Sequence, residues 1–138
     1  MEFFDTLVRF ETALWNTIER ELLHSGQVGL GTLTALRVLH RHNGSGRVQD
    51  LSRELALTIG AASKLADRLE RDGLAVRRPH PTDRRSSLVS LTETGEGARA
   101  GGEEVLGLAL AQVLGGDADA ATATSAIQRL QLRLDARS

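Results

Sequence analysis

The chain has no cysteine and little proline, aromatic residue or net charge. Without cysteine it can form neither a disulfide nor a thiolate metal site, and it cannot sense oxidants through a thiol. Its 17 basic and 18 acidic side chains leave a net charge of −1, which excludes a globally basic nucleic-acid binder. Any affinity for a polyanion must therefore come from a local patch.

Long apolar runs are also missing. No run approaches the roughly 18 residues that a membrane-spanning helix needs. The first residues, Met1 to Asp5, carry no basic side chain of the kind that opens a signal peptide. We therefore expect a cytoplasmic protein without a membrane partner. Its 138 residues have room for one domain, or for one domain with an assembly element.

Residues 74–92 contain a basic β-hairpin. Short β-prone runs flank a turn cluster of Pro, Thr and Asp, and two prolines, Pro79 and Pro81, should prevent regular pairing within the loop. Four arginines opposed by one aspartate give this hairpin a local excess of three positive charges: Arg77, Arg78, Arg84, Arg85 and Asp83. A solvated charged turn would explain such a hairpin in isolation, whereas the preceding residues favour contact with phosphate.

Two helices joined by a tight turn precede the hairpin, at residues 50–57 and 58–72. In the second, Thr58 is placed to act as N-cap and Gly73 to supply a left-handed C-cap. Its apolar residues recur at i, i+3, i+4 and i+7 and define one buried stripe: Ala62, Leu65, Ala66 and Leu69. The opposite face must point outward. A helix-turn-helix followed at once by a basic hairpin is a winged helix.

An ordered set of segments resembles the MarR-type transcriptional regulators over roughly residues 30–97. The matching segments are residues 32–39, 51–55 and 63–74, followed in the wing by Asp83, Arg85, Leu88, Leu91, Thr92 and Gly95. The resemblance implies a mainly α fold with a small β-hairpin wing (α+β), in which N- and C-terminal dimerisation helices flank the winged helix-turn-helix.

The flanking segments are helical in pattern. Residues 2–24 carry a wide apolar stripe, residues 43–46 read as a loop, and residues 94–114 and 117–137 read as two further helices that break at Gly115 and Gly116. We expect an N-terminal dimerisation helix (residues 1–30), a DNA-binding region (31–93) and C-terminal dimerisation helices (94–138). The surplus apolar faces favour a homodimer, while a monomer whose terminal helices cover one another is the alternative.

Double-stranded DNA is the expected partner, bound at a pseudo-palindromic operator. The expected contacts in the recognition helix are Thr58, Gly60, Ala61, Ser63, Lys64 and Arg68, and those in the wing are Arg77, Arg78, His80, Asp83, Arg84 and Arg85. The resemblance implies that Arg85 enters the minor groove and that Asp83 shapes the wing by pairing with a neighbouring arginine. A turn-forming role for Asp83 is compatible with this. Because Gly60 and Ala61 offer no polar side chain, the wing should carry a large share of the affinity.

The resemblance also implies a repressor that a small aromatic or anionic effector releases from DNA. Trp15, His24 and His40 could line an effector crevice, although packing in the core is the simpler role for Trp15. His40 and His42 point apart, so we expect no metal site and no cofactor.

Three other functions can be weighed against the repressor. The chain shows no nucleophile-base arrangement, no phosphate-cradling glycine loop and no metal cluster, so we do not expect an enzyme. A winged-helix protein-interaction module and a ligand-blind DNA-binding protein remain the alternatives. Four arginines in one hairpin favour DNA over a neutral protein contact.

Overall fold

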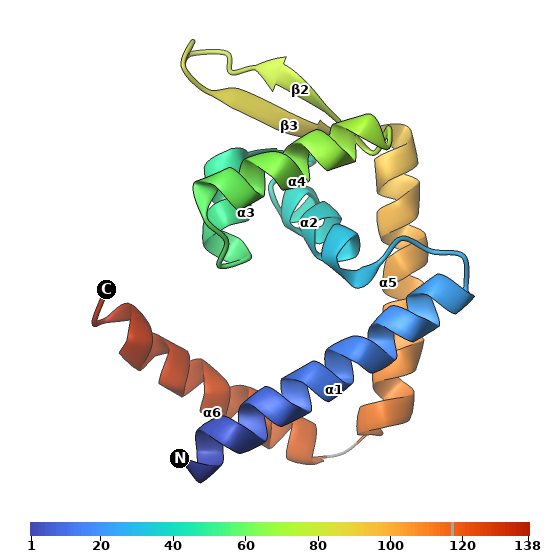
Figure 1. Ribbon diagram of the computed structural model, residues 1–138, viewed down its shortest axis with the longest axis vertical. Coiled ribbons are helices and arrows are strands. Elements are labelled where there is room, and N and C mark those ends of the chain that lie inside the picture. The colour runs from blue at the N-terminus through green and yellow to red at the C-terminus, as the bar shows by residue number, and fades with distance from the viewer. Residues whose placement is uncertain (117) are drawn as a thin grey trace. The chain divides into compact units, whose positions relative to one another are not determined.

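The computed structural model describes residues 1–116 and 118–138. In chain order the elements are α1 (Glu2–His24), α2 (Leu30–Arg41), β1 (Ser45–Arg47), α3 (Val48–Glu54), α4 (Ile59–Arg71), β2 (Ala75–Pro79), β3 (Ser87–Leu91), α5 (Glu93–Leu114) and α6 (Ala118–Asp135) (Figure 1). This confirms the predicted fold class, mainly α with a small wing. The predicted start of the last helix at Asp117 lies outside the described residues.

The chain divides into two compact units, Met1–Leu106 and Gly107–Ser138, and α5 runs from the first into the second. The first unit holds the hydrophobic core, in which α2, α3 and α4 pack with the sheet. Leu36, Leu39, Leu51, Leu69 and Val89 are each fully buried there. The predicted stripe of α4 is buried as expected. The winged helix therefore closes its own core within a single chain.

The sheet has three antiparallel strands in the order β1-β3-β2. The prediction of a loop at residues 43–46 is wrong for residues 45 and 46, because Ser45–Arg47 forms β1 and pairs with β3. Only Asn43 and Gly44 make the turn, with φ angles of 57° and 87°. Pro79 is also paired, opposite Ser87, as the last residue of β2. This edge strand tolerates proline because it needs no donor on its outer side.

The first motif helix begins and ends earlier than predicted. It starts at Val48 because the Asp50 carboxylate accepts the Arg47 backbone N–H at 2.8 Å and caps the first turn. It ends at Glu54, before Ala56 adopts a φ of 53°. The turn into α4 is therefore longer than the sequence indicated.

The entry of α5 is fixed against the turn between α4 and β2. Thr92 Oγ1 donates to the Gly73 carbonyl oxygen at 2.6 Å and accepts the Gly95 N–H at 3.0 Å. A Cβ at Gly95 would collide with the Leu74 carbonyl oxygen, so only glycine allows this close approach. The end of the recognition helix and the start of α5 are thus held together.

Only the C-terminal part of α1 is buried, at Ile18 and Leu22. Ahead of them Phe3, Phe4 and Phe10 are 59%, 63% and 51% exposed. Trp15 is 40% exposed, so the expectation that it packs in the core is wrong for the single chain. The predicted apolar stripe exists, but within the first unit most of it has no cover.

The second unit comprises the end of α5 and α6. The predicted break at Gly115 and Gly116 is confirmed, since α5 ends at Leu114. No residue of α6 is buried, and its apolar side chains Ile127, Leu132 and Leu134 are exposed. Among the described residues, none of the helices combines the length and apolar character needed to cross a membrane.

Candidate nucleic-acid interface

The recognition helix α4 is capped as its sequence predicts. Thr58 Oγ1 accepts the Ala61 backbone N–H at 3.1 Å, and Gly73 follows the helix with a φ of 73°. The buried stripe fixes the rotation of the helix about its axis. As a result, the polar residues are divided between two flanks.

The two flanks of α4 face different surroundings. One flank carries Ser63 and Asp67, which lie beside the wing. The other carries Ala61, Lys64 and Arg68, which line a groove formed with α1, α2 and the end of α3. Of the six predicted contacts of this helix, Ser63 faces the wing, whereas Ala61, Lys64 and Arg68 line the groove.

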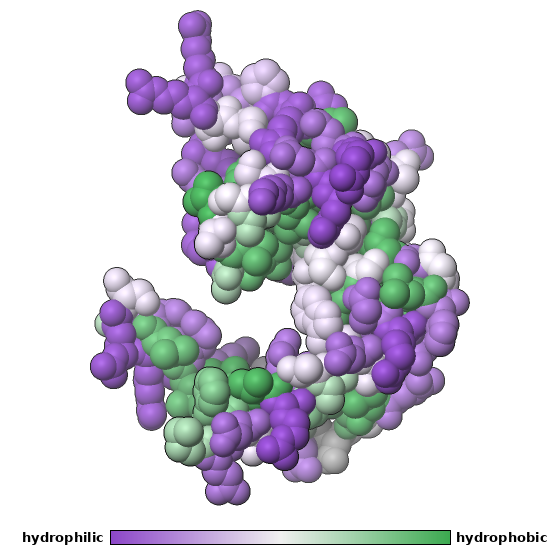
Figure 2. All heavy atoms as spheres, viewed as in Figure 1, coloured by the Kyte–Doolittle hydropathy of each residue, from purple (hydrophilic) through white to green (hydrophobic). Residues whose placement is uncertain are grey.

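Three of the wing arginines are available for contact. Arg78, Arg84 and Arg85 are exposed, and no side chain of the described residues holds their guanidinium groups. The tip of the hairpin is hydrophilic throughout (Figure 2). Arg77 differs from the other three, because its Nη2 donates to Asp67 Oδ1 at 2.6 Å and to the Ser63 carbonyl oxygen at 3.2 Å.

The turn of the wing is braced by two side chains that the sequence analysis placed among the DNA contacts, His80 and Asp83. The backbone N–H groups of Thr82 and Asp83 donate to His80 Nδ1 at 3.2 Å and 3.1 Å, and Nε2 of the same ring lies 2.7 Å from Arg47 Nη2. The Asp83 carboxylate accepts the Arg85 backbone N–H at 3.0 Å. Its expected ion pair with an arginine is absent among the described residues, so the turn-forming role is the one the structure supports.

A polar hollow of about 300 Å³ lies between the wing and the motif helices. It is lined by Arg85, by hydroxyl groups of the wing and of α4, and by residues that the sequence analysis missed: Arg47, Gln49 and Ile59. Ile59 is 55% exposed in the first turn of α4, where an apolar side chain can meet a thymine methyl group. The sequence offered one signal for Arg47, since it is a basic residue just before the first motif helix.

The groove on the other flank of α4 has a volume of about 590 Å³. Trp15 lines it from α1, Leu55 and Leu57 from the turn after α3, and Lys64 and Arg68 from α4. The expected crevice residues are not brought together. His40 lines a separate hollow with Glu93 and Glu96, and His24 lines neither of these pockets. Trp15 is thus the single expected crevice residue in this groove.

Two carboxylates near the winged helix are held in the charged form. Hydrogen bonding to His42 lowers the pKa of Glu54, and Arg41 acts in the same direction. Hydrogen bonding to Arg99 lowers the pKa of Glu96. His40 lies 3.3 Å from Glu96 and His42 contacts Glu54, so both histidines face carboxylates. No group of residues suited to a metal ion occurs in the described part of the chain.

Comparison with known protein families gives a match in the central part of the chain. Residues 27–86 match the family model described as "MarR family". A transcriptional regulator of Bacillus subtilis, the uncharacterized HTH-type YwhA, is 35% identical over 63 residues, which cover 46% of this chain and 45% of that protein. The B. subtilis regulator MhqR is 34% identical over 56 residues, covering 41% and 39%. The chain therefore spans less than half the length of these curated relatives. Both are named as transcriptional regulators, in agreement with the expectation that the chain is not an enzyme.

Solved structures extend the likeness to nearly the whole chain. A mutant MarR from E. coli complexed with operator DNA has a TM-score of 0.83 at 22% identity, with 94% of each chain covered. CouR from Rhodococcus jostii RHA1, bound to p-coumaroyl-CoA, has a TM-score of 0.79 at 20% identity, covering 92% of this chain and 88% of that one. At these identities the likeness shows the fold. The chain is thus similar to the MarR family over residues 27–86, and it has the winged-helix fold of these structures.

Proposed function

We propose that the chain is a sequence-specific DNA-binding regulator of transcription. The observation that carries this proposal is the exposure of Arg78, Arg84 and Arg85 on the wing, together with the hollow that Arg85 lines with Ile59 and Ser63 of α4. A helix of this kind reads base edges in the major groove, while arginines at a hairpin tip reach phosphates and the minor groove. The likeness to a MarR complexed with operator DNA supports the same assignment.

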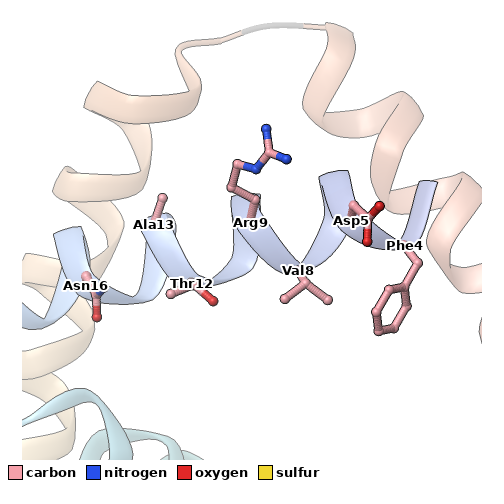
Figure 3. Close-up of a pocket in the computed structure, with 7 residues that line it drawn as sticks. All are labelled: Phe4, Asp5, Val8, Arg9, Thr12, Ala13 and Asn16. Carbon is pink, nitrogen blue, oxygen red and sulfur yellow. The ribbon is translucent and has the colours of Figure 1, made fainter. Parts of the chain in front are cut away.

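The regulator acts as a homodimer on a pseudo-palindromic operator. The exposed apolar residues of α1 support this proposal, because four of them lie within its first ten residues: Phe3, Phe4, Val8 and Phe10. Figure 3 shows Phe4 and Val8 pointing to the same side of α1, with Thr12 and Asn16 continuing the row. Two winged helices related by a two-fold axis would place their half-sites about 10 base pairs apart.

Selection of bound fragments from genomic DNA tests this function, with the region upstream of the protein's own gene included. Binding should weaken steeply as salt is raised. If each exposed wing arginine of a dimer meets one phosphate, the slope of log K against log salt is about −5. Binding that ignores salt, or no binding to any fragment, would favour the winged-helix protein-interaction module instead.

A small aromatic or anionic effector regulates this DNA binding, most simply as release of a repressor. The groove beside α4 has the composition for such a compound: Trp15 offers an aromatic face, while Lys64 and Arg68 offer positive charge. CouR, solved with p-coumaroyl-CoA, and a regulator solved in a 2,4-dichlorophenol bound form share the fold. An occupant of this groove would lie directly against the recognition helix.

Titration with phenolic and carboxylate compounds tests the effector. Trp15 is the only tryptophan of the chain and lines this groove, so its fluorescence is sensitive to an occupant there. A binding compound should change that fluorescence and raise the melting temperature together. If no compound does either, the protein is a ligand-blind DNA-binding regulator.

A further inference from the structure

Arg77 differs from the other wing arginines in where its side chain goes. It leaves β2 toward the recognition helix, where Nη2 donates to Asp67 Oδ1 at 2.6 Å and to the Ser63 carbonyl oxygen at 3.2 Å. Its side chain is 28% exposed, compared with 66% for Asp67. The guanidinium group is therefore already occupied by α4 before any DNA arrives.

The main chain of Arg77 makes a second connection to the same helix. Its backbone N–H donates to Glu70 Oε2 at 2.8 Å. β2 is an edge strand of the sheet, and outward N–H groups of an edge strand have no partner in the ladder. Glu70 supplies that partner. One residue of the wing is thus tied to α4 at two points separated by nearly a turn of the helix.

A phosphate at Arg77 would lie beside the Asp67 carboxylate, which already accepts a short, charge-assisted hydrogen bond from Nη2. Only Nε and Nη1 of Arg77 would remain for the phosphate, and contact there would bring it close to that carboxylate. The geometry instead suits a brace between wing and helix, because Nη2 alone donates to both Asp67 and the Ser63 carbonyl oxygen.

We propose that the Arg77–Asp67 pair sets the position of the wing relative to the recognition helix, and that Arg77 is a positioning residue rather than a phosphate contact. This inference rests on the proposed DNA-binding function. It leaves phosphate contact to Arg78, Arg84 and Arg85. It also gives an acidic residue on the recognition helix a favourable part in binding a polyanion.

The sign of one substitution separates the two roles. Asp67→Asn removes a negative charge beside DNA and frees Arg77, so simple electrostatics requires tighter binding. If the pair positions the wing, the same substitution weakens operator binding by roughly three- to tenfold, in the range expected for a partly exposed ion pair and its hydrogen bonds. Asp72→Asn is the matched control, because it removes a carboxylate from the end of the same helix outside the brace. It should leave the affinity unchanged or raise it slightly.

A double-mutant cycle adds a second criterion. Arg77→Gln should weaken binding by about as much as Asp67→Asn, and the double variant should be no weaker than the poorer single variant. Additive losses, or tighter binding by Asp67→Asn, would overturn the inference while leaving DNA binding itself intact.

Hydrogen exchange without DNA keeps the two proposals separable. Asp67→Asn should speed amide exchange in residues 77–87, while Asp72→Asn should not. Failure of the wild-type protein to bind any DNA would refute the proposed function. Unchanged exchange in the wing of Asp67→Asn would refute the brace independently of that result.

Discussion

The winged helix and residues 2–15 of α1 are both rich in apolar side chains, but only the winged helix buries them. Leu36, Leu39 and Leu69 are fully buried between helices of the same chain, whereas Phe4 is 63% exposed on α1. The winged helix therefore has a hydrophobic core of its own, whereas the apolar side chains in the first half of α1 are exposed within the first unit. We expect the winged helix to carry the stability of the protein and the first half of α1 to carry the proposed assembly, and substitutions can test this division.

The largest effect is expected in the core. Leu36→Ala removes a fully buried side chain and should lower the free energy of unfolding by about 2–5 kcal/mol. Phe4→Ala removes a larger side chain, but in dilute protein it should cost less than about 0.5 kcal/mol, as exposed positions do. Urea unfolding of both variants at low protein concentration measures the contrast. Equal losses would mean that α1 is already covered within the single chain.

A substitution on the exposed apolar face of α1 should weaken dimer formation without lowering the stability of the winged helix. Val8→Glu places a charge on the exposed apolar face of α1 and should raise the dimer dissociation constant about 100-fold, because an unpaired charge is costly to bury. The winged helix should remain folded. Sedimentation gives the dissociation constant, and binding to a full palindrome should fall more than binding to a half-site.

Thr94→Glu is the control for this charge, since Thr94 is exposed at the start of α5. A Val8→Glu protein that sediments as the wild-type dimer would remove the assembly role from this face. The apolar residues of α6 would then be the next candidates.

A second comparison concerns the proposed DNA-binding surface. There we expect the wing to contact DNA and the groove flank of α4 to contribute little. Arg85→Ala should weaken operator binding at least tenfold, about 1.4 kcal/mol, and reduce the salt slope by about 1 per protomer. Arg68→Ala removes the same charge from the groove flank and should have a much smaller effect. Fluorescence anisotropy with labelled operator at several salt concentrations measures both. If Arg68→Ala costs as much as Arg85→Ala, the groove flank also faces DNA.

Sequence patterns sufficed for the recognition helix α4 and its two ends. The burial of Ala62, Leu65, Ala66 and Leu69 follows from a single helix and its 3.6-residue repeat. The caps at Thr58 and Gly73 follow from the preferences of individual residues. These features depend on neighbours within a few positions, which a sequence displays directly.

Features that join distant segments were missed for the opposite reason. β1 exists because Ser45–Arg47 meets β3, more than 40 residues later, and nothing in its glycine-rich sequence indicates a strand. The partners of Arg77 lie on another element, so a count of charges placed it with the free arginines of the tip. His80 was placed among the DNA contacts, because its hydrogen bonds with Arg47 and with the turn join residues whose proximity the sequence does not display. The sequence shows the chemical type of a side chain, whereas its role depends on the residues that the fold places next to it.

The smallest effect concerns pH, and it compares a carboxylate of the helix-turn-helix with one on α5. The pKa of Glu54 is lowered, first by hydrogen bonding to His42, from a reference value of 4.5. A carboxyl group whose pKa falls on folding contributes stability above its unfolded pKa, and this contribution is lost as pH falls through the lower folded value. We therefore expect the urea midpoint to decline below about pH 4.5, and Glu54→Gln to make that decline shallower.

The matched variant is Glu96→Gln, which removes the carboxylate whose pKa Arg99 lowers. The Glu96 side chain is 42% exposed, compared with 26% for Glu54, so solvent screens its interaction more strongly. The decline in stability with acid should accordingly flatten less in Glu96→Gln than in Glu54→Gln. The reverse order would locate the main acid-sensitive contact at the Glu96–Arg99 pair on α5, and part of the protein's stability would then come from this flanking helix.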